Sequence, residues 1–344
     1  MSKRLTRRRL LGAVPAVGLG ATALHAAIPH GHGSAAAAAE HGASGAHATG
    51  NGHAAFRGGE VDHRANGFDP HTILRDFDRG RTSRMADGRT LREWTLIASE
   101  HEIEIAPGVR FTAWSYNGRI PGPTLRATEG DRLKITFING GRHPHTIHFH
   151  GIHPAAMDGV AGLGDGEIGP GGRTVYEFDA APYGLQLYHC HVRPLAEHIA
   201  KGLYGTLIID PQQPRAKADE MIMVMNGFDT NFDRANELYA ANTIGFAYSD
   251  KPVQVKRGEL VRVYLVNVLE YDLINSFHLH GNFFHYFPTG SSRQPSEFTD
   301  TVMLCQGQRG ILEMRFPNTG KYMFHAHQSE FTELGWMGFF EVSA

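Results

Sequence analysis

The chain has 344 residues, of which 41% are hydrophobic and 20% are charged, and its formal net charge is −2 with neutral histidines. This composition is typical of a globular protein long enough for two domains, and it lacks the basic excess that would indicate a nucleic-acid partner. Two cysteines are too few for a disulfide framework, whereas 22 histidines are unusually many.

The first 27 residues have the pattern of an export signal. Five basic residues lie between Lys3 and Arg9, and a short, weakly apolar run interrupted by Pro15 and several glycines follows them. The run is too broken for a membrane span, and TRRRLL resembles the twin-arginine signal of bacterial export. We predict a signal peptide over 1–27 and an exported, periplasmic or extracellular mature protein with no membrane span. An uncleaved anchor is the alternative.

Residues 28–89 are predicted to be a flexible segment and linker. Up to about residue 66 the chain is rich in Ala, Gly and His, as in HGHGSAAAAAEHG, and this composition buries too little apolar surface to become ordered. The histidines of this segment either bind metal ions loosely or are incidental parts of a solvated linker.

From about residue 90 the sequence has the pattern of an all-β protein. Short runs such as LKITFIN and TVYEFDA alternate or cluster β-branched and aromatic residues, and Gly, Pro, Asn and Asp separate these runs. Long amphipathic helical patterns are scarce.

The β-rich part contains an internal repeat. TLRATEGDRLKITFIN (124–139) aligns with PVQVKRGELVRVYLVN (252–267), and a His-x-His pair follows each copy. Each copy closes with a second His-x-His pair, and a polar stretch at 210–220 joins the two copies. We therefore predict two β-sandwich domains, over 90–212 and 213–344.

The spacing of the paired histidines indicates a metal site. Residues i and i+2 of a strand project to the same side, so each pair offers two imidazoles to one face. Chance does not account for four pairs in register with a repeat, and eight histidines in an ordinary core would each need a polar partner. The predicted ligands are His148, His150, His189, His191, His278, His280, His325 and His327.

Cys190 lies between two of these histidines and must therefore face the other side of its strand. His145 precedes His148 by three residues, so parity turns it away from the first pair and toward the cysteine. His198 lies in a proline-containing loop that can fold back to join them. One thiolate and two imidazoles form the ligand set of a blue-copper centre.

The second copy lacks this ligand set. Asn275 stands where the first copy has His145, and Ala326 stands where it has Cys190. The second domain therefore kept the paired histidines of one metal site and lost the cysteine-containing ligand set of the other. Cys305 lies outside any ligand pattern, and we interpret it as a buried free thiol.

NGRIPGPTLRATEGD (117–131) and HFHG (148–151) resemble the opening of a cupredoxin domain of multicopper oxidases. Over about residues 90–344 the chain resembles the two-domain multicopper oxidases, or small laccases, that keep a type 1 copper in the first domain. The resemblance implies two cupredoxin-like Greek-key sandwiches. It also places Leu203 at the axial position of the type 1 copper and Phe331 where a ligand histidine would fall in the second copy. Leucine cannot coordinate, so a relatively oxidising site is expected.

The resemblance further implies the cofactors and the assembly. His145, Cys190 and His198 would bind the type 1 copper. The eight paired histidines would bind one type 2 copper and a type 3 pair, between the first domain of one subunit and the second domain of its neighbour. Three subunits would close a ring, the usual end of a head-to-tail interface.

The implied activity is laccase-like. Small donors, either phenolic and aromatic molecules or metal ions, would lose one electron at a time near His198, because this later loop histidine tends to lie close to the surface. Electrons would pass from Cys190 through the backbone to its two neighbours, and O2 would be reduced to water. Asp158 is the expected proton-relay acid, with a turn aspartate before Gly159 as the alternative. Glu330 is a weaker candidate for the same role, and a loop or rim carboxylate is the favoured interpretation of it.

Two alternatives remain open from the sequence. Copper nitrite reductase, also a trimer of two-domain chains, shares the His145–His150 spacing and the long loop after Cys190. That enzyme, however, has a catalytic aspartate where this chain has His148, and it needs only three histidines at its second copper. A copper storage or transfer protein that uses the histidine-rich tail would not explain the paired motifs.

Overall fold

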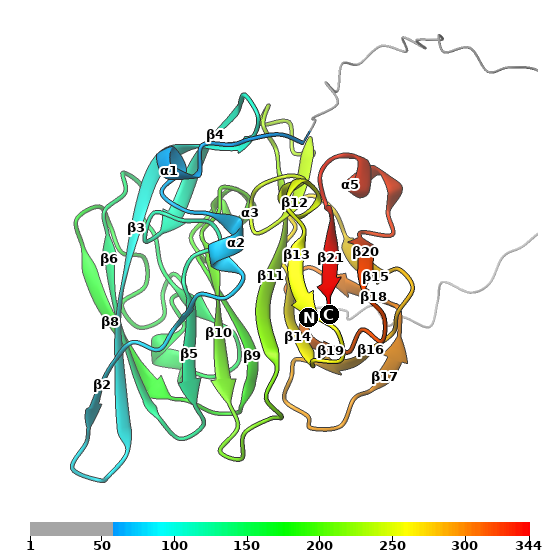
Figure 1. The fold of residues 1–344 in the computed structure, drawn as a ribbon. Coiled ribbons are helices and arrows are strands. Elements are labelled where there is room, and N and C mark those ends of the chain that lie inside the picture. The colour runs from blue at the N-terminus through cyan, green and yellow to red at the C-terminus, as the bar shows by residue number, and fades with distance from the viewer. Residues whose placement is uncertain (1–57) are drawn as a thin grey trace, which may run out of the picture. The chain divides into compact units, whose positions relative to one another are not determined.

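The computed structural model describes residues 58–344, which form mainly β-strands with a few short helices (Figure 1). The predicted signal peptide and residues 28–57 lie outside the described residues. Within the described part of the chain, no helix is long and apolar enough to cross a bilayer. The predicted all-β fold of two sandwiches is confirmed.

The first sandwich consists of two sheets. One has the strand order β1-β5-β10-β9-β7, and the other has the order β2-β3-β6-β8, with β4 paired to β3. Burial alternates residue by residue along β6, as expected of a strand with one face on a core. The strands are β1 Phe77–Asp78, β2 Arg81–Arg84, β3 Thr90–Ala106, β4 Val109–Tyr116, β5 Thr124–Thr128, β6 Arg132–Asn139, β7 His148–Phe149, β8 Arg173–Asp179, β9 Gly184–His189 and β10 Tyr204–Asp210.

The second sandwich also has two sheets, with the orders β12-β11-β14-β19-β16-β17 and β13-β21-β20-β15-β18. Its strands are β11 Asp219–Phe228, β12 Leu238–Ala241, β13 Val253–Lys256, β14 Val261–Asn267, β15 Ile274–Leu279, β16 Phe284–Pro288, β17 Glu297–Thr299, β18 Thr301–Cys305, β19 Arg309–Met314, β20 Gly320–His325 and β21 Met337–Ser343. The helices are α1 His63–Asn66, α2 Pro70–Ile73, α3 Leu195–Ala200, α4 Ala247–Asp250 and α5 Ser329–Glu333, with a 3-10 turn at Ala155–Met157.

Strand β11 divides its side chains between two cores. Met221, Met223 and Met225 point into the core inside the second sandwich, whereas Ile222 and Val224 point into a core between the sandwiches. All five side chains are at most 1% exposed. The two sandwiches are therefore joined by a continuous apolar core, in which each fully buried aliphatic side chain stabilises the fold by about 1.5–3 kcal/mol.

Strand β9 is divided in the same way on the side of the first sandwich. Leu185 and Leu187 point into the core between the sandwiches, and Tyr188 and Cys190 point into the core of the first sandwich. Packing on both faces fixes β9 and the residues that follow it.

Residues 58–89 differ from the prediction, which assigned 28–89 to a flexible linker. They contain α1, α2, β1 and β2. Val61, Phe68 and Ile73 are at most 9% exposed and belong to the core between the sandwiches. These apolar side chains anchor residues 58–89 to the core. The prediction missed this because it extended the linker from the Ala/Gly/His-rich stretch before them.

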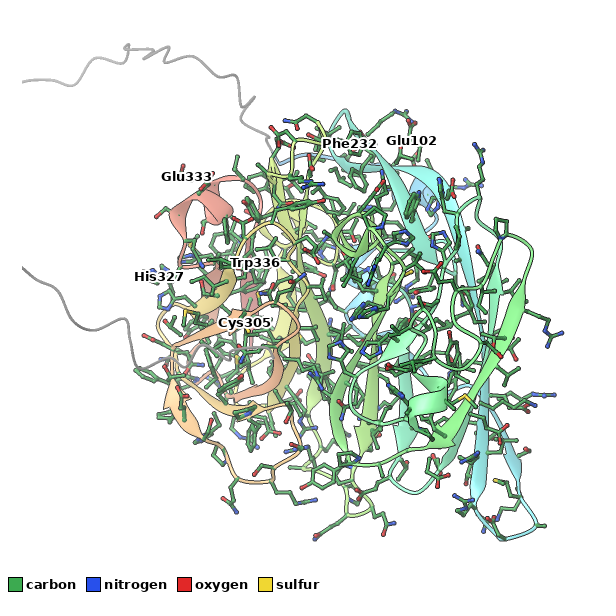
Figure 2. All side chains as sticks on the ribbon, turned by 180° about the vertical axis from the view of Figure 1, so that it is seen from behind. Glu102, Phe232, Cys305, His327, Glu333 and Trp336 are labelled. Atoms are coloured by element: carbon green, nitrogen blue, oxygen red, sulfur yellow. The ribbon has the colours of Figure 1, made fainter. Side chains whose placement is uncertain are left out.

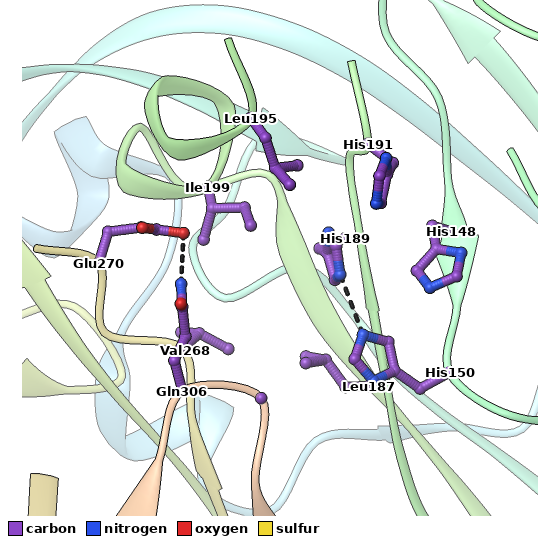
Figure 3. Close-up of a pocket in the computed structure, with 11 residues that line it drawn as sticks. His148, His150, Leu187, His189, His191, Leu195, Ile199, Val268, Glu270 and Gln306 are labelled. Carbon is purple, nitrogen blue, oxygen red and sulfur yellow. Dashed lines mark hydrogen bonds between the residues drawn. The ribbon is translucent and has the colours of Figure 1, made fainter. Parts of the chain in front are cut away.

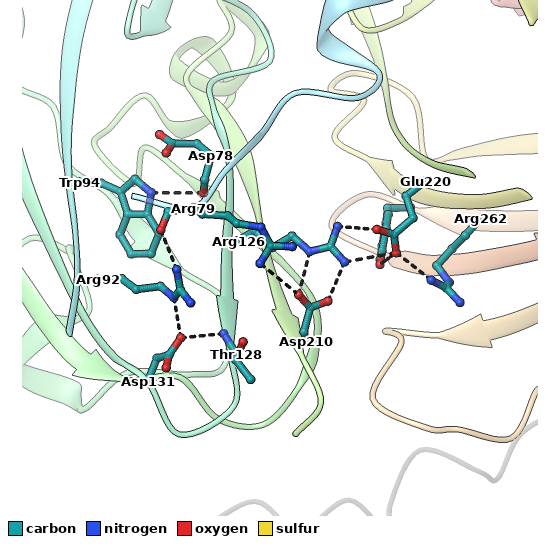
Figure 4. A network of polar contacts seen from close by, with 11 residues as sticks. Asp78, Arg79, Arg92, Trp94, Arg126, Thr128, Asp131, Asp210, Glu220 and Arg262 are labelled. Atoms are coloured by element: carbon teal, nitrogen blue, oxygen red, sulfur yellow. Dashed lines mark hydrogen bonds and ion pairs between the residues drawn. The ribbon is translucent and has the colours of Figure 1, made fainter. Parts of the chain in front are cut away.

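A network of ion pairs also joins the sandwiches (Figure 4). Arg126 of β5 donates to both carboxylate oxygens of Asp210 at 2.8 Å and to Oε2 of Glu220 at 2.6 Å. Oε1 of Glu220, on β11, accepts from Arg262 at 2.7 Å and from the Tyr264 hydroxyl at 2.9 Å. Glu220 thereby links the first strand of the second sandwich to the first sandwich.

We predict that Glu220→Gln lowers the free energy of unfolding by about 3 kcal/mol at neutral pH, because it leaves buried guanidinium groups with one partner fewer. Burial alone would raise the pKa of Glu220, but the contacts with Arg126 and Arg262 outweigh burial and lower it from 4.5 to about 2. The stabilisation is therefore present above pH 4.5 and is lost as the pH falls toward 2. Urea unfolding at several pH values measures this difference, and a difference that does not shrink in acid would contradict the prediction.

Candidate metal centre

Three donor side chains converge at the end of β9. Sγ of Cys190 lies 3.2 Å from Nδ1 of His198 and 3.9 Å from Nδ1 of His145, and these two nitrogens are 3.2 Å apart. Cys190 directly follows β9, His198 comes from α3, and His145 is held by a bridge to Ile168. The structure thus brings together the cysteine and two histidines that the sequence placed in one set, which we call the trigonal set.

The trigonal set is sealed from solvent, with Cys190 and His145 at 0% and His198 at 2% exposure. Burial, together with the neighbouring His198, lowers the pKa of His145 to about 4, and burial lowers the pKa of His198 to about 4. Both imidazoles are neutral near pH 7, the form that binds a metal. Burial also raises the pKa of the Cys190 thiol, which favours the protonated form. A bound metal cation would instead favour the thiolate, because its positive charge stabilises the negative sulfur. Two imidazole nitrogens and one sulfur around a single point fit copper.

Leu203 lies beside the trigonal set and is fully buried. Its carbonyl oxygen accepts from the Cys190 amide at 2.9 Å, and its own amide donates to the His198 carbonyl at 3.2 Å. The Thr146 amide donates to Sγ of Cys190 at 3.4 Å. The leucine side chain carries no atom that could bind a metal, which would give a bound copper a higher reduction potential.

Four imidazoles lie on the other side of the strand, around a cavity of about 290 Å³ (Figure 3). His148 and His189 are direct partners across β7 and β9. Nε2 of His150 lies 3.0 Å from Nε2 of His189, and the ring centre of His148 is 5.1–5.3 Å from those of the other three. We call His148, His150, His189 and His191 the first histidine set.

Hydrogen bonds orient two rings of the first histidine set, those of His148 and His189. Nδ1 of His189 lies 2.8 Å from the Cys190 carbonyl oxygen. Nδ1 of His148 lies 2.9 Å from both the carbonyl oxygen and Oδ1 of Asp158, and Oδ1 is also 3.4 Å from His153. Acceptors at Nδ1 leave the Nε2 atoms free to bind a metal. Burial lowers the pKa of His189 to about 4, so this ring is neutral near pH 7.

The second domain repeats this arrangement. His278 and His325 are direct partners across β15 and β20, and Nε2 of His280 lies 2.9 Å from Nε2 of His325. Nδ1 of His325 lies 2.5 Å from the Ala326 carbonyl oxygen, just as His189 contacts the residue that follows it. We call His278, His280, His325 and His327 the second histidine set.

The two histidine sets are separate within one chain. Ring contacts connect the histidines inside each set, and among residues 58–344 none connects one set to the other. The first set faces a cavity, whereas His280 and His327 are exposed, and Figure 2 shows His327 at the outer edge of the second domain. Within residues 58–344 the two sets are therefore two distinct clusters of imidazoles.

The second sandwich has packing residues where the first has the trigonal set. The counterparts Asn275, Ala326 and Phe331 are all buried. The Ala326 amide donates to the Trp336 carbonyl at 3.3 Å, as the Cys190 amide donates to that of Leu203. Trp336, which is 1% exposed, thus replaces a small aliphatic side chain and fills this part of the core (Figure 2).

Two positions differ from expectation. His198 is 2% exposed, so it does not lie near the surface as predicted. Cys305 is exposed on β18 at the edge of its sheet, so the prediction of a buried thiol is wrong. Glu330, the weaker proton-relay candidate, is exposed on α5, and its carboxylate makes no hydrogen bond or ion pair within the described range 58–344. Its role stays a prediction.

Sequence reasoning missed the residues that the second domain contributes to the first set's cavity. Glu270 and Gln306 line this cavity and are hydrogen-bonded to each other (Figure 3). Burial raises the pKa of Glu270. Both lie in loops after strands, and no local pattern marks them because their position depends on how the sandwiches pack.

Comparisons with known proteins agree with this geometry. Family models described as multicopper oxidase match residues 98–214 and 216–344. A crystal structure of a multicopper oxidase is 63% identical in sequence, with a TM-score of 0.81, over 83% of this chain and 100% of that chain.

Curated relatives are more distant. The copper-containing nitrite reductase of Neisseria meningitidis is 27% identical over 248 residues, which are 66% of this chain and 63% of that protein. Laccase-2 of Botryotinia fuckeliana is 36% identical over 127 residues, 36% of this chain and 21% of that protein. The chain spans 62–63% of the length of the Neisseria nitrite reductases that it matches.

Two cupredoxin-like sandwiches that present a cysteine between paired histidines define a copper protein. The chain belongs to the multicopper oxidase family, a family of copper-dependent oxidoreductases.

We predict that Cys190→Ser removes the intense blue absorption of the copper-loaded protein, because that absorption needs a sulfur ligand, while the histidine sets keep most of their metal. Absorption spectra and metal analysis measure both effects. Cys305→Ser is the matched control, because it removes an exposed thiol on β18 and should leave the colour unchanged. Blue absorption that persists without the Cys190 sulfur would contradict the assignment.

Proposed function

We propose that the protein is a laccase-like oxidase that couples one-electron oxidation of small donors to reduction of O2 to water. The observation that carries this proposal is the placement of Cys190 and its neighbours. The cysteine belongs to the trigonal set, and His189 and His191 belong to the first histidine set on the opposite side.

The residues present fit one copper at the trigonal set and further coppers at the histidine sets, with one type 2 copper and a type 3 pair as the expected complement. Bound copper would supply one-electron redox chemistry and the reduction of O2. Peptide bonds join Cys190 to His189 and His191, so the two sites are connected by a short covalent path that does not depend on side-chain contacts.

Asp158 is the acid best placed to serve the first histidine set. Its carboxylate lies 2.9 Å from His148 and 3.4 Å from His153, so it can fix the His148 tautomer and hold a proton beside the cavity. Glu330 stays a prediction for the assembled protein, because it lies in α5 a few residues after His327 of the second histidine set.

The homotrimer is proposed because each chain carries two separate histidine sets. The first set lines a cavity, whereas the second set has exposed histidines at the surface of the second domain. The exposed side of the second domain also carries Leu273 at 89% and Met303 at 64% exposure, near the second histidine set. An apolar surface around an incomplete site favours burial against another copy. A head-to-tail contact between first and second domains closes into a ring.

We further propose export by the twin-arginine route to the periplasm or beyond. The basic start of the chain and the apolar run after it support this location. The electron donor is proposed to be a small reductant, either a phenolic or aromatic molecule or a metal ion such as Cu(I) or Fe(II).

Mixed assemblies test the shared site. His148→Ala and His278→Ala chains carry different tags, are co-expressed and are purified through both tags. Each variant alone should consume no O2 and yet remain blue and reducible. A mixed ring of three contains a single intact junction, so it should recover about one third of wild-type O2 consumption. No recovery in doubly purified protein would contradict a site shared between chains.

An assay for nitrite reduction distinguishes the proposed oxidase from a nitrite reductase. The similarity to copper-containing nitrite reductases makes this the second candidate function. We expect the copper-loaded wild type to consume O2 with at least one of a phenol, Cu(I) or Fe(II), and to reduce no nitrite anaerobically. Anaerobic nitrite turnover without O2 consumption would instead establish the reductase.

A further inference from the structure

An indole separates the trigonal set from solvent. Trp114 of β4 has its ring centre 4.8 Å from that of His198 and 5.3 Å from that of His145, edge-on to both. Trp114 is only 5% exposed, and both histidines are at most 2% exposed. A donor in solution therefore cannot touch either imidazole of the trigonal set.

One exposed ring covers the indole. His143 stacks on Trp114 with a centroid distance of 4.8 Å and an interplanar angle of 29°. Its side chain is 53% exposed. Nδ1 of His143 lies 3.0 Å from Oε1 of Glu100, and the same oxygen accepts from the Arg142 amide at 2.8 Å. Glu100 thereby holds the imidazole flat on the indole.

We propose that electrons enter the protein through the His143–Trp114 stack, with His143 as the contact for the donor and Trp114 as the bridge to His198. This inference rests on the proposed oxidase function and adds the place where the donor acts. Each donor loses one electron, which the trigonal site receives. Trp114 and His143 end the step unchanged, and neither has to gain or lose a proton.

The geometry of the stack supports a bridging role. The rings of His143, Trp114 and His198 follow one another at centroid distances of 4.8 Å, so π-systems are in van der Waals contact from the surface to the trigonal set. Trp114 also contacts His145, whereas the direct His143–His145 contact is longer, with a centroid distance of 6.5 Å. The path through Trp114 is therefore the one whose successive rings lie closest together.

The rim of the stack carries features that suit small aromatic or anionic donors. The Lys201 ammonium lies 5.4 Å from the centre of the Trp114 ring and 4.4 Å from that of Phe232. Phe232 is 62% exposed, and Figure 2 shows it at the surface. A cation beside the indole and an exposed ring beside that cation provide charge and stacking area for a planar donor.

Trp114→Leu tests the bridge. The copper-loaded protein is mixed anaerobically with hexacyanoferrate(II) or with 2,6-dimethoxyphenol, and the loss of blue absorption is followed by stopped flow. We expect bleaching to slow about tenfold or more with both donors. The position of the blue band and the reduction potential should not change. Trp94→Leu is the matched control, because Trp94 is equally buried in the first sandwich but does not contact the trigonal set.

His143→Lys tests the contact point without disturbing the core. The new ammonium keeps a partner in Glu100 and adds one positive charge at the surface. Because the variant loses the imidazole, bleaching should slow with both donors, and the added charge should make the slowing several-fold smaller with anionic hexacyanoferrate(II) than with cationic hexaammineruthenium(II). His285→Lys, at an exposed position on β16, should change neither rate.

The inference is overturned if Trp114→Leu bleaches at the wild-type rate, or if a changed reduction potential accounts for its slower bleaching. Equal responses of His143→Lys and His285→Lys would also overturn it, even if Trp114→Leu does not fold. A wild-type protein that is blue and consumes O2 keeps the proposed oxidase function in each of these cases. A wild type that is never blue refutes the proposed function itself.

Discussion

The candidate metal centre depends on the alternation of side chains at the end of β9. Cys190 turns into the first sandwich, and the histidines on either side of it turn toward the cavity. A shift of one residue in the register of β9 would exchange these faces and destroy both sites. The same alternation keeps the sites apart in space while peptide bonds connect them. Packing of β9 on both of its faces holds that register.

The two sandwiches show how a duplicated domain divides its functions. Both keep a direct cross-strand histidine pair, His148 with His189 and His278 with His325. In the second sandwich, Trp336 packs where Leu203 lies in the first, and Asn275, Ala326 and Phe331 stand in place of the cysteine and two histidines. In the proposed trimer each histidine set supplies half of a shared site, so metal binding and assembly would depend on each other.

Much of the site could be predicted from the sequence because the information is local. The alternation of side chains along a strand predicted that Cys190 faces the opposite side from His189 and His191. The internal repeat identified the residues of the second domain that correspond to the trigonal set. Other features depend on long-range packing and were out of reach. Val61 anchors a segment that composition marked as a linker, and Glu270 reaches the first set's cavity from the second sandwich. The burial of His198 under Trp114 likewise follows from β4 packing against α3, which no motif encodes.

Anomalous scattering at the copper edge from crystals of the copper-loaded protein tests the central claim most directly. We expect one copper beside Sγ of Cys190 on one side of β9. We expect the remaining copper on the opposite side, between the first histidine set of one chain and the second set of another. Copper on only one side of β9, or a second histidine set that binds its metal without a neighbouring chain, would contradict the account.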